Sequence, residues 1–455
     1  MLRALAWRTA ALLLLLSPLS RGESISRKII ISDLHLGAGT PLAGKPNHLE
    51  DFRFDSQFRT FLETFRDKPT ELVIAGDFID FWQILPERNV KNDSVVGSTE
   101  ADSIEKVRVA INGHRGVFKV LGEFVSYFPQ NRIVVVPGNH DVDLTWPGVQ
   151  KELRQATTIE DPRKLLFVSG GYRDHDIWVE HGHQYDELNR FENVDHPWKT
   201  LQNGQRLEVN WGTEFVQKVF NKVEEKLEFI DNLVPTTDVI WLALRREPSL
   251  ARDMPNLWRF IAHAKRSQQA LLALGREVYQ GGEPAEMMAD DPKLIFNTFS
   301  GSPDQFVSGI QKLYDEDENF RAKLSEQFRL LSEEERRALA IPVVFGEKQT
   351  TTLGVVGTDP YVEAAERIRT KEGVKVVVFG HTHEARTYPP DSSMPFYLNT
   401  GCWIQTLSVT EAKRHDWSSL KLDDRTVFPL RFSWVSVNYG NRREPVAKLN
   451  VWSGN

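Results

Sequence analysis

The sequence has little cysteine, no excess of positive charge and no long hydrophobic run beyond its first residues. Cys402 is the only cysteine among 455 residues, which excludes an intrachain disulfide and a zinc site built on several cysteines. Cys402 follows the apolar run FYLNTG, so we expect a buried structural thiol. Lysine and arginine number 56 against 63 acidic residues, a formal net charge of −7. This balance disfavours a broad basic face for nucleic acid.

The one pronounced apolar stretch lies at the N-terminus. Arg3 and Arg8 precede a run of alanines and leucines, which a Ser-Pro pair ends, and the small residues Ser20 and Gly22 follow. This pattern favours a secretory signal peptide over residues 1–22, and therefore an exported protein, periplasmic or secreted, with no membrane span after cleavage. A wrongly assigned start and an uncleaved anchor are the alternatives, although the run is shorter than the ~20 residues that span a bilayer.

The chain is long enough for one large α/β domain with an insertion, or for two or three small domains. Residues 23–185 alternate apolar β-branched runs with helical patterns, which predicts parallel strands joined by crossover helices. Residues 186–360 have a mostly helical pattern, and we expect an inserted cap there; a separate helical domain is the alternative. The α/β pattern returns over 361–455 and ends in a predicted antiparallel pair at Arg431–Trp452.

Five short islands of aspartate, asparagine and histidine run through the sequence. They read Asp33-Leu34-His35, Gly76-Asp77-Phe78-Ile79-Asp80, Gly138-Asn139-His140-Asp141, His181-Gly182-His183 and Gly380-His381-Thr382-His383. Four islands directly follow an apolar β-branched run. The fifth follows the mixed run DIWVE, which we interpret as the second strand of a hairpin turning near Gly170-Gly171. Oxygen and imidazole ligands at the carboxyl ends of several strands are typical of a metal centre in an open α/β sheet.

In this order, the islands resemble the signature of the calcineurin-like metallophosphoesterases: D-x-H, GDxxD, GNH(D/E), a separate His-Gly, and GHxH. Each pattern alone arises often by chance, but five in order, at the ends of predicted strands, do not. The resemblance covers roughly residues 27–185 and 370–405. It implies the α/β fold of that family, a two-sheet α/β sandwich, here with a large, mostly helical insertion.

The resemblance also implies a binuclear metal centre, whose ligands follow position by position. The implied ligands are Asp33, His35, Asp77, Asn139, His181, His381 and His383. Asp77 would bridge two divalent metal ions. The first ion would take Asp33, His35 and His383, and the second would take Asn139, His181 and His381. His183 is the alternative to His181. Such donors accept Mn, Fe, Zn, Co or Ni, so the sequence leaves the metal open.

His140 matches the histidine of the family that is not a metal ligand. The resemblance implies that it stabilises charge on the phosphoryl group or protonates the leaving oxygen. We expect Asp141 to orient His140 through a hydrogen bond, as carboxylate–imidazole pairs do. Asp80 would support the ligands rather than bind metal. Trp82 closely follows the second island, and it is the one tryptophan that we weigh as a contact for the substrate rather than as a core residue.

The resemblance implies hydrolysis of a phosphoric ester, with a small phosphorylated substrate, by water activated between two metal ions. Monoesters, diesters and pyrophosphates all remain open, as does the oligomeric state. The phrases GDFIDFW and EHGHQYD are similar to the branch of UDP-2,3-diacylglucosamine pyrophosphatases and related bacterial hydrolases. However, the pyrophosphatases usually have arginine where this chain has His140, and they act on the cytoplasmic side. A catalytically silent metal-binding protein and a phosphoprotein phosphatase are the alternatives.

Overall fold

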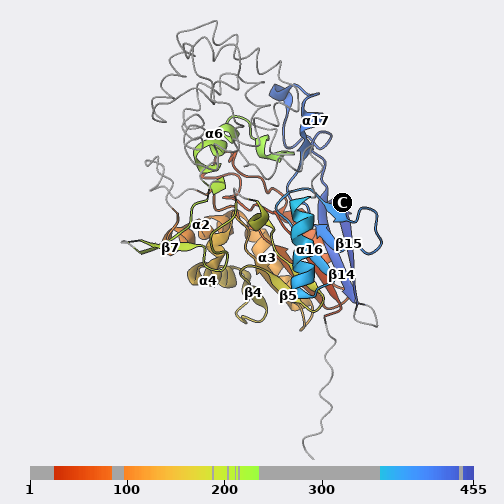
Figure 1. Cartoon of the computed structure of the whole chain (residues 1–455). Coiled ribbons are helices and arrows are strands. Elements are labelled where there is room, and N and C mark those ends of the chain that lie inside the picture. The colour runs from red at the N-terminus through yellow and green to blue at the C-terminus, as the bar shows by residue number, and fades with distance from the viewer. Residues whose placement is uncertain are drawn as a thin grey trace, which may run out of the picture.

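The computed structural model describes residues 25–84, 97–186, 189–201, 204–210, 212–213, 216–234, 359–439 and 444–454. Two β-sheets form its centre (Figure 1). The first has the order β15-β14-β1-β2-β3-β4, with strands Arg27–Ile31 (β1), Thr70–Ala75 (β2), Arg132–Val136 (β3), Leu165–Phe167 (β4), Phe432–Tyr439 (β14) and Pro445–Trp452 (β15). The second has the order β11-β12-β10-β6-β5, with strands Tyr172–Asp174 (β5), Ile177–Val179 (β6), Val376–Phe379 (β10), Arg386–Tyr388 (β11) and Tyr397–Asn399 (β12).

The two sheets pack through a shared apolar layer. Alternate residues of the first sheet, such as Ile30 and Val73, belong to one buried cluster with Val179 and Val378 of the second sheet. The intervening residues of β1 to β3 point the other way, into a second cluster with the helices. Since β-strand side chains alternate between faces, a run that is buried throughout, such as Thr70–Ala75, requires cover on both sides.

Helices provide that cover (Figure 1). The helices on the first sheet are α1 (Asp55–Glu63), α2 (Glu100–Gly113), α3 (Arg115–Tyr127) and α4 (Pro147–Thr157). Helix α16 (Pro360–Glu372) packs on the outer face of the second sheet. Thr99 caps α2 in a capping box with Asp102, which satisfies backbone N–H groups at its first turn. The layer order is therefore helix, sheet, sheet, helix, and the predicted two-sheet α/β sandwich is confirmed.

Figure 1 shows α6, from the described part of the predicted insertion, at the same end of the sandwich as α17, whereas β7 lies at the side near α2 and α4. The elements of this part are β7 (Trp198–Leu201), β8 (Gly204–Leu207), a π-helical turn η3 (Val216–Phe220), α6 (Asn221–Glu224), the turn η4 (Ile230–Asn232) and β9 (Leu233–Val234). Strand β9 pairs in parallel with β13 (Leu407–Ser408), just before α17 (Val409–Ala412). Residues 235–358 of the predicted cap lie outside the described residues, so the domain boundaries stay a prediction.

Two predictions about the strands have opposite outcomes. The closing antiparallel pair is confirmed, since β14 pairs with β15 over its full length. The hairpin turning near Gly170-Gly171 was wrong, because β4 lies in the first sheet and β5 in the second. The observed hairpin is β5–β6. Gly170 has a φ of 72°, and this left-handed glycine lies where the chain crosses from one sheet to the other.

Two other sequence-based predictions concern the N-terminus and the cysteine. The predicted signal peptide lies outside the described residues. Among the described helices, none is long and apolar enough to cross a membrane. Cys402 is buried and free, as predicted, and burial raises the pKa of its thiol to about 12.

Candidate metal centre

The five islands meet at one edge of the sandwich, where the carboxyl ends of both sheets come together. Asp33, Asp77 and Asn139 follow β1, β2 and β3, which are neighbouring parallel strands. His181 and His381 follow β6 and β10, which are neighbouring parallel strands of the second sheet. Parallel strands end at the same edge, and the packing of the two sheets on each other brings residues more than 300 positions apart into one site.

The backbone of the site is held in an unusual conformation. Positive φ angles, between 49° and 70°, occur at Asp33, His35, Asp77, His381 and His383. A non-glycine residue in this region costs on the order of 1 kcal/mol or more. Backbone hydrogen bonds hold two of the loops together, because the amides of residues 34 and 35 both donate to the carbonyl of Asp77. Strain concentrated on the predicted ligands indicates a functional constraint on these loops.

Three positions of the islands require glycine because a larger residue would overlap its neighbours. A Cβ on Gly76, whose φ is +90°, would overlap the ring of His181. A Cβ on Gly138 would overlap Asp77 Oδ1, and one on Gly380 would fall 2.6 Å from an Asp33 carboxylate oxygen. The glycine in each Gly-Asp, Gly-Asn and Gly-His pair therefore lets a ligand loop approach another ligand closely.

Asp33, His35 and His383 form the first ligand cluster, with their ligand atoms all within 4.8 Å of one another. The Nε2 atoms of His35 and His383 lie 3.1 Å apart, and Asp33 Oδ1 lies 3.4 Å from His383 Nε2. His35 Nδ1 lies 3.0 Å from Asp80 Oδ2. A hydrogen bond from Nδ1–H to this carboxylate leaves the Nε2 lone pair directed into the cluster, as metal binding requires.

The second cluster contains Asp77, His181 and His381. His181 Nδ1 donates to the carbonyl of Ala75 at 2.8 Å, so its Nε2 again presents a lone pair. This Nε2 lies 3.0 Å from Asp77 Oδ2 and 3.1 Å from Asn139 Oδ1. The same Asp77 oxygen is 3.7 Å from His35 Nε2 of the first cluster. Asp77 thus lies between the clusters, in the position that a bridging carboxylate would occupy.

The charges in the site compensate one another through protons. Burial opposes ionisation of Asp77, but the charges of His181 and His140 outweigh it and hold the pKa of the carboxyl well below its usual range. Burial likewise opposes charge on His35 and His181, yet the nearby aspartates raise the pKa of each imidazole to about 9. Among the described residues, no lysine or arginine pairs with Asp33 or Asp77. Divalent cations would replace these protons, since metal ligands must be deprotonated.

Comparison with known protein families identifies a family whose sequence pattern this chain matches. Residues 26–247 match the family described as calcineurin-like phosphoesterase. This part of the chain belongs to the calcineurin-like phosphoesterase family. No curated protein matches the chain. The matched residues end before the last island, and the structure adds His381 and His383 to the same site. Family membership and the ligand clusters together support metal-dependent phosphoester hydrolysis in general.

His140 forms a further group of possible ligands with His35 and Asp77, and two neighbours support its ring. Its Nδ1 is 2.8 Å from Asp80 Oδ2, the oxygen that also contacts His35. The indole of Trp82 stacks on its ring, with centroids 3.8 Å apart and planes 28° from parallel. The side chain of His140 is 17% exposed, whereas Asp80 and Trp82 are buried. The buried pair therefore fixes an imidazole that a substrate can still reach.

The expected hydrogen bond from His140 to Asp141 does not form. The carboxylate of Asp141 accepts instead from the backbone amides of Gly138 at 2.6 Å and Phe78 at 2.7 Å. The tight turn of residues 138–141 directs Asp141 back onto its own loop, and Asp80 takes the place predicted for it. Asp141 thus holds the third island against the second rather than orienting His140.

Several residues of the site were missed or left open by sequence reasoning. His183, the alternative to His181, has its Nε2 2.7 Å from Gln184 Nε2 and belongs to none of the ligand clusters among the described residues. Asp186 was missed by sequence reasoning, and its Oδ2 lies 3.2 Å from His381 Nε2. The only signal in the sequence is its position five residues after His181, too far to indicate contact without the turn η2 (His183–Tyr185).

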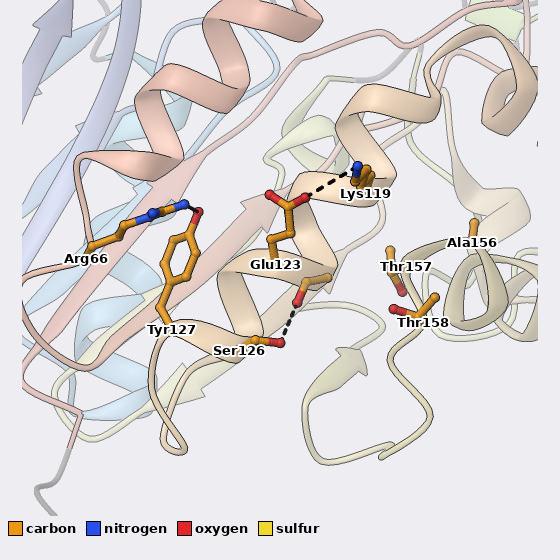
Figure 2. Close-up of a pocket in the computed structure, with 9 residues that line it drawn as sticks. Arg66, Lys119, Glu123, Ser126, Tyr127, Ala156, Thr157 and Thr158 are labelled. Carbon is orange, nitrogen blue, oxygen red and sulfur yellow. Dashed lines mark hydrogen bonds and ion pairs between the residues drawn. The ribbon is translucent and has the colours of Figure 1, made fainter.

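A surface groove of about 700 Å³ lies over the helices rather than at the metal centre (Figure 2). Its charged and polar residues interact with each other: Arg66 donates to the Tyr127 hydroxyl, and Lys119 pairs with Glu123. None of its lining residues belongs to an island. We assign no function to this groove.

Proposed function

We propose that this phosphoesterase hydrolyses a phosphoric ester of a small molecule with two divalent metal ions held by the two ligand clusters. The observation that carries the proposal is the position of Asp77, within reach of His181 on one side and His35 on the other. Asp33, His35 and His383 would hold one ion, and Asn139, His181 and His381 the other. Two such ions neutralise phosphoryl oxygens and lower the pKa of water.

The protein's own groups complete the chemistry. His140 donates Nδ1–H to Asp80, which leaves Nε2 for the phosphoryl or leaving oxygen. With Nδ1 held by this carboxylate, His140 can stabilise negative charge through Nε2–H and give that proton to the leaving group. Trp82 limits rotation of the ring by stacking, which holds the proton at a fixed place.

The test is hydrolysis by metal-stripped protein refilled with Mn²⁺. Bis-p-nitrophenyl phosphate, p-nitrophenyl phosphate, a nucleoside diphosphate sugar and a phosphopeptide separate diesterase, monoesterase, pyrophosphatase and phosphoprotein phosphatase activity. We expect turnover of at least one small substrate that disappears on stripping. Asp77→Asn should lose the same turnover. Its matched control is Asp391→Asn, because Asp391, like Asp77, has a positive φ but lies on an exposed turn. Two bound metal ions without any turnover would instead favour the catalytically silent binding protein.

We also infer export from the N-terminal pattern. The expected mature protein starts near residue 23, and the mass of the protein recovered outside the cytoplasm tests this directly. An intact N-terminus in that fraction would favour an uncleaved anchor.

A further inference from the structure

A second group of acids lies beside the metal centre but outside it. Asp51, Glu224 and Asp231 place carboxylate oxygens within 4.8 Å of one another. Asp51 belongs to the core, before α1, whereas Glu224 and Asp231 belong to the segment predicted as an insertion. Asp51 is 4% exposed and Glu224 is fully buried. Carboxylates at such separations and burial repel one another unless something neutralises them.

The described residues provide little compensation. No lysine or arginine among them pairs with the three carboxylates, and the positive group that acts on Asp51 is His35. The amide nitrogen of Gln83 is the shared partner, at 3.3 Å from Asp51, 3.2 Å from Glu224 and 3.2 Å from Asp231. One amide nitrogen carries two hydrogens, so it cannot satisfy three carboxylates.

Unpartnered buried atoms point to a missing ligand. Asp51 Oδ1, Asp231 Oδ1 and Gln83 Oε1 are all buried without a hydrogen-bond partner, and Gln83 itself is only 6% exposed. The oxygen and nitrogen of a glutamine amide exchange on a half-turn of χ3. That half-turn would place the unpartnered carbonyl oxygen at the centre of the three carboxylates, and it would remove the amide hydrogens from the same place.

The separations suit a hard cation. Two oxygens that each bind Ca²⁺ at about 2.4 Å can lie no more than about 4.8 Å apart, and the three carboxylate oxygens meet this limit. Three carboxylates and an amide carbonyl are all-oxygen donors, which favour Ca²⁺, Mg²⁺ or Mn²⁺ over metals that prefer nitrogen or sulfur. This donor set differs from the histidine-rich set of the metal centre.

We propose that Asp51, Gln83, Glu224 and Asp231 form a separate binding site for one hard divalent cation, which fastens residues 216–234 to the core. The fastened segment contacts the loop that supports His140. Asn221 Nδ2 donates to the carbonyl of Trp82 at 3.2 Å, and the backbone N–H of Gln83 donates to Asp80 Oδ1 at 3.0 Å. The cation is therefore a positioning element for Trp82 and Asp80, and takes no part in the reaction.

The test counts bound metal ions per chain by equilibrium dialysis of the full-length protein against Mn²⁺ and Ca²⁺ together. We expect the double variant Glu224→Gln/Asp231→Asn to bind one equivalent fewer than wild type. Asp51→Asn, which changes the core side of the site, should lose the same equivalent and serves if the double variant does not fold. Glu225→Gln is the matched control, because Glu225 is the exposed neighbour of Glu224 and should keep the wild-type count.

Equal totals in wild type and the folded variants would overturn the proposal. The carboxyl groups would then hold protons, and their replacement by amides would remove the cost of taking up those protons at neutral pH, which should raise the unfolding temperature of the double variant. The readout is independent of the proposed catalytic centre. If that centre bound no metal ions, the difference of one equivalent between wild type and double variant would remain.

Discussion

The same three strands, β1, β2 and β3, carry a buried charged cluster at each end, and the two clusters are built differently. At the amino ends, Lys28 pairs with Glu71 and Asp174, and Glu71 also accepts from Arg132. The Tyr172 hydroxyl adds a hydrogen bond to Glu71 at 3.0 Å. Lys28 and Glu71 are almost fully buried. This end is neutralised by cationic side chains of the protein itself.

At the carboxyl ends the acids face histidines and other acids. Asp33 and Asp77 have no lysine or arginine partner among the described residues, and the ligand loops keep left-handed residues that the amino ends lack. A buried charge without a fixed partner is costly. The comparison teaches that fixed cationic side chains complete the amino-end cluster, whereas histidine protons, or the metal ions that we propose, compensate the acids of the carboxyl-end cluster.

The largest expected effect comes from the residue between the two ligand clusters. Asp77→Asn keeps the size of the side chain but removes the shared negative charge, so both ions lose a ligand. We expect kcat/KM for the best substrate to fall about 1,000-fold or more, with loss of bound metal and little change in the unfolding temperature. Unchanged activity with a full metal content would remove Asp77 from the proposed bridge.

Lys28→Met tests the charged cluster at the amino ends of the strands. We expect it to lower stability and to leave metal content and activity unchanged, the reverse of Asp77→Asn. The change leaves Glu71 buried with fewer partners, which costs about 3 kcal/mol of unfolding free energy. Urea denaturation measures this loss. Metal content and kcat of the folded fraction should stay at the wild-type level, and a variant that lost metal ions without losing stability would contradict the division of roles between the two ends.

His140→Asn separates the reacting group from the metal ligands. Because His140 is adjacent to the clusters but outside the predicted ligand set, we expect kcat to fall about 100-fold while metal content and the unfolding temperature are retained. Trp82→Phe should have a smaller effect of the same kind, since it weakens the stacking on His140 and keeps the Asp80 hydrogen bond. Loss of metal in His140→Asn would mean that His140 is a ligand.

The smallest effect concerns a third buried charged group, in which side chains of the protein again neutralise one another. His114 contacts Glu50 at 3.1 Å and Asp55 at 3.0 Å; burial opposes its charge, but these carboxylates raise its pKa to about 9. A raised pKa stabilises the fold fully below the unfolded value near 6.5 and loses that contribution as pH rises through about 9. We expect about 1–2 kcal/mol less stability at pH 10 than at pH 6, beyond the change seen in His114→Gln.

The sequence was sufficient to predict that the five islands meet at the carboxyl edge. The reason is physical: each island follows a strand, parallel strands of one sheet end at the same edge, and the two sheets pack with these edges together. The Nε2 atoms of His35 and His383 therefore lie 3.1 Å apart, although 348 positions separate them in the sequence. The glycines of the islands then permit close approach, as at Gly76 against His181. Motif and topology thus agree without knowledge of any side-chain conformation.

Details that depend on side-chain direction or distant segments could not be predicted. Asp80 and Asp141 both lie near His140 in space, and adjacency in sequence favoured Asp141, whereas the turn at residues 138–141 directs it away. Tyr172 begins a strand of the second sheet because the chain crosses over at Gly170, and no local pattern indicates which sheet a three-residue strand joins. The contact of Asp51 with Asp231 depends on how residues 216–234 pack against the core.

The most direct test of the central claim is the electron paramagnetic resonance spectrum of the metal-stripped protein refilled with Mn²⁺. If the two ligand clusters hold ions that share Asp77, the wild-type spectrum contains an exchange-coupled Mn²⁺ pair, and Asp77→Asn loses it. A fully loaded wild-type protein that shows only isolated Mn²⁺ ions would contradict the account.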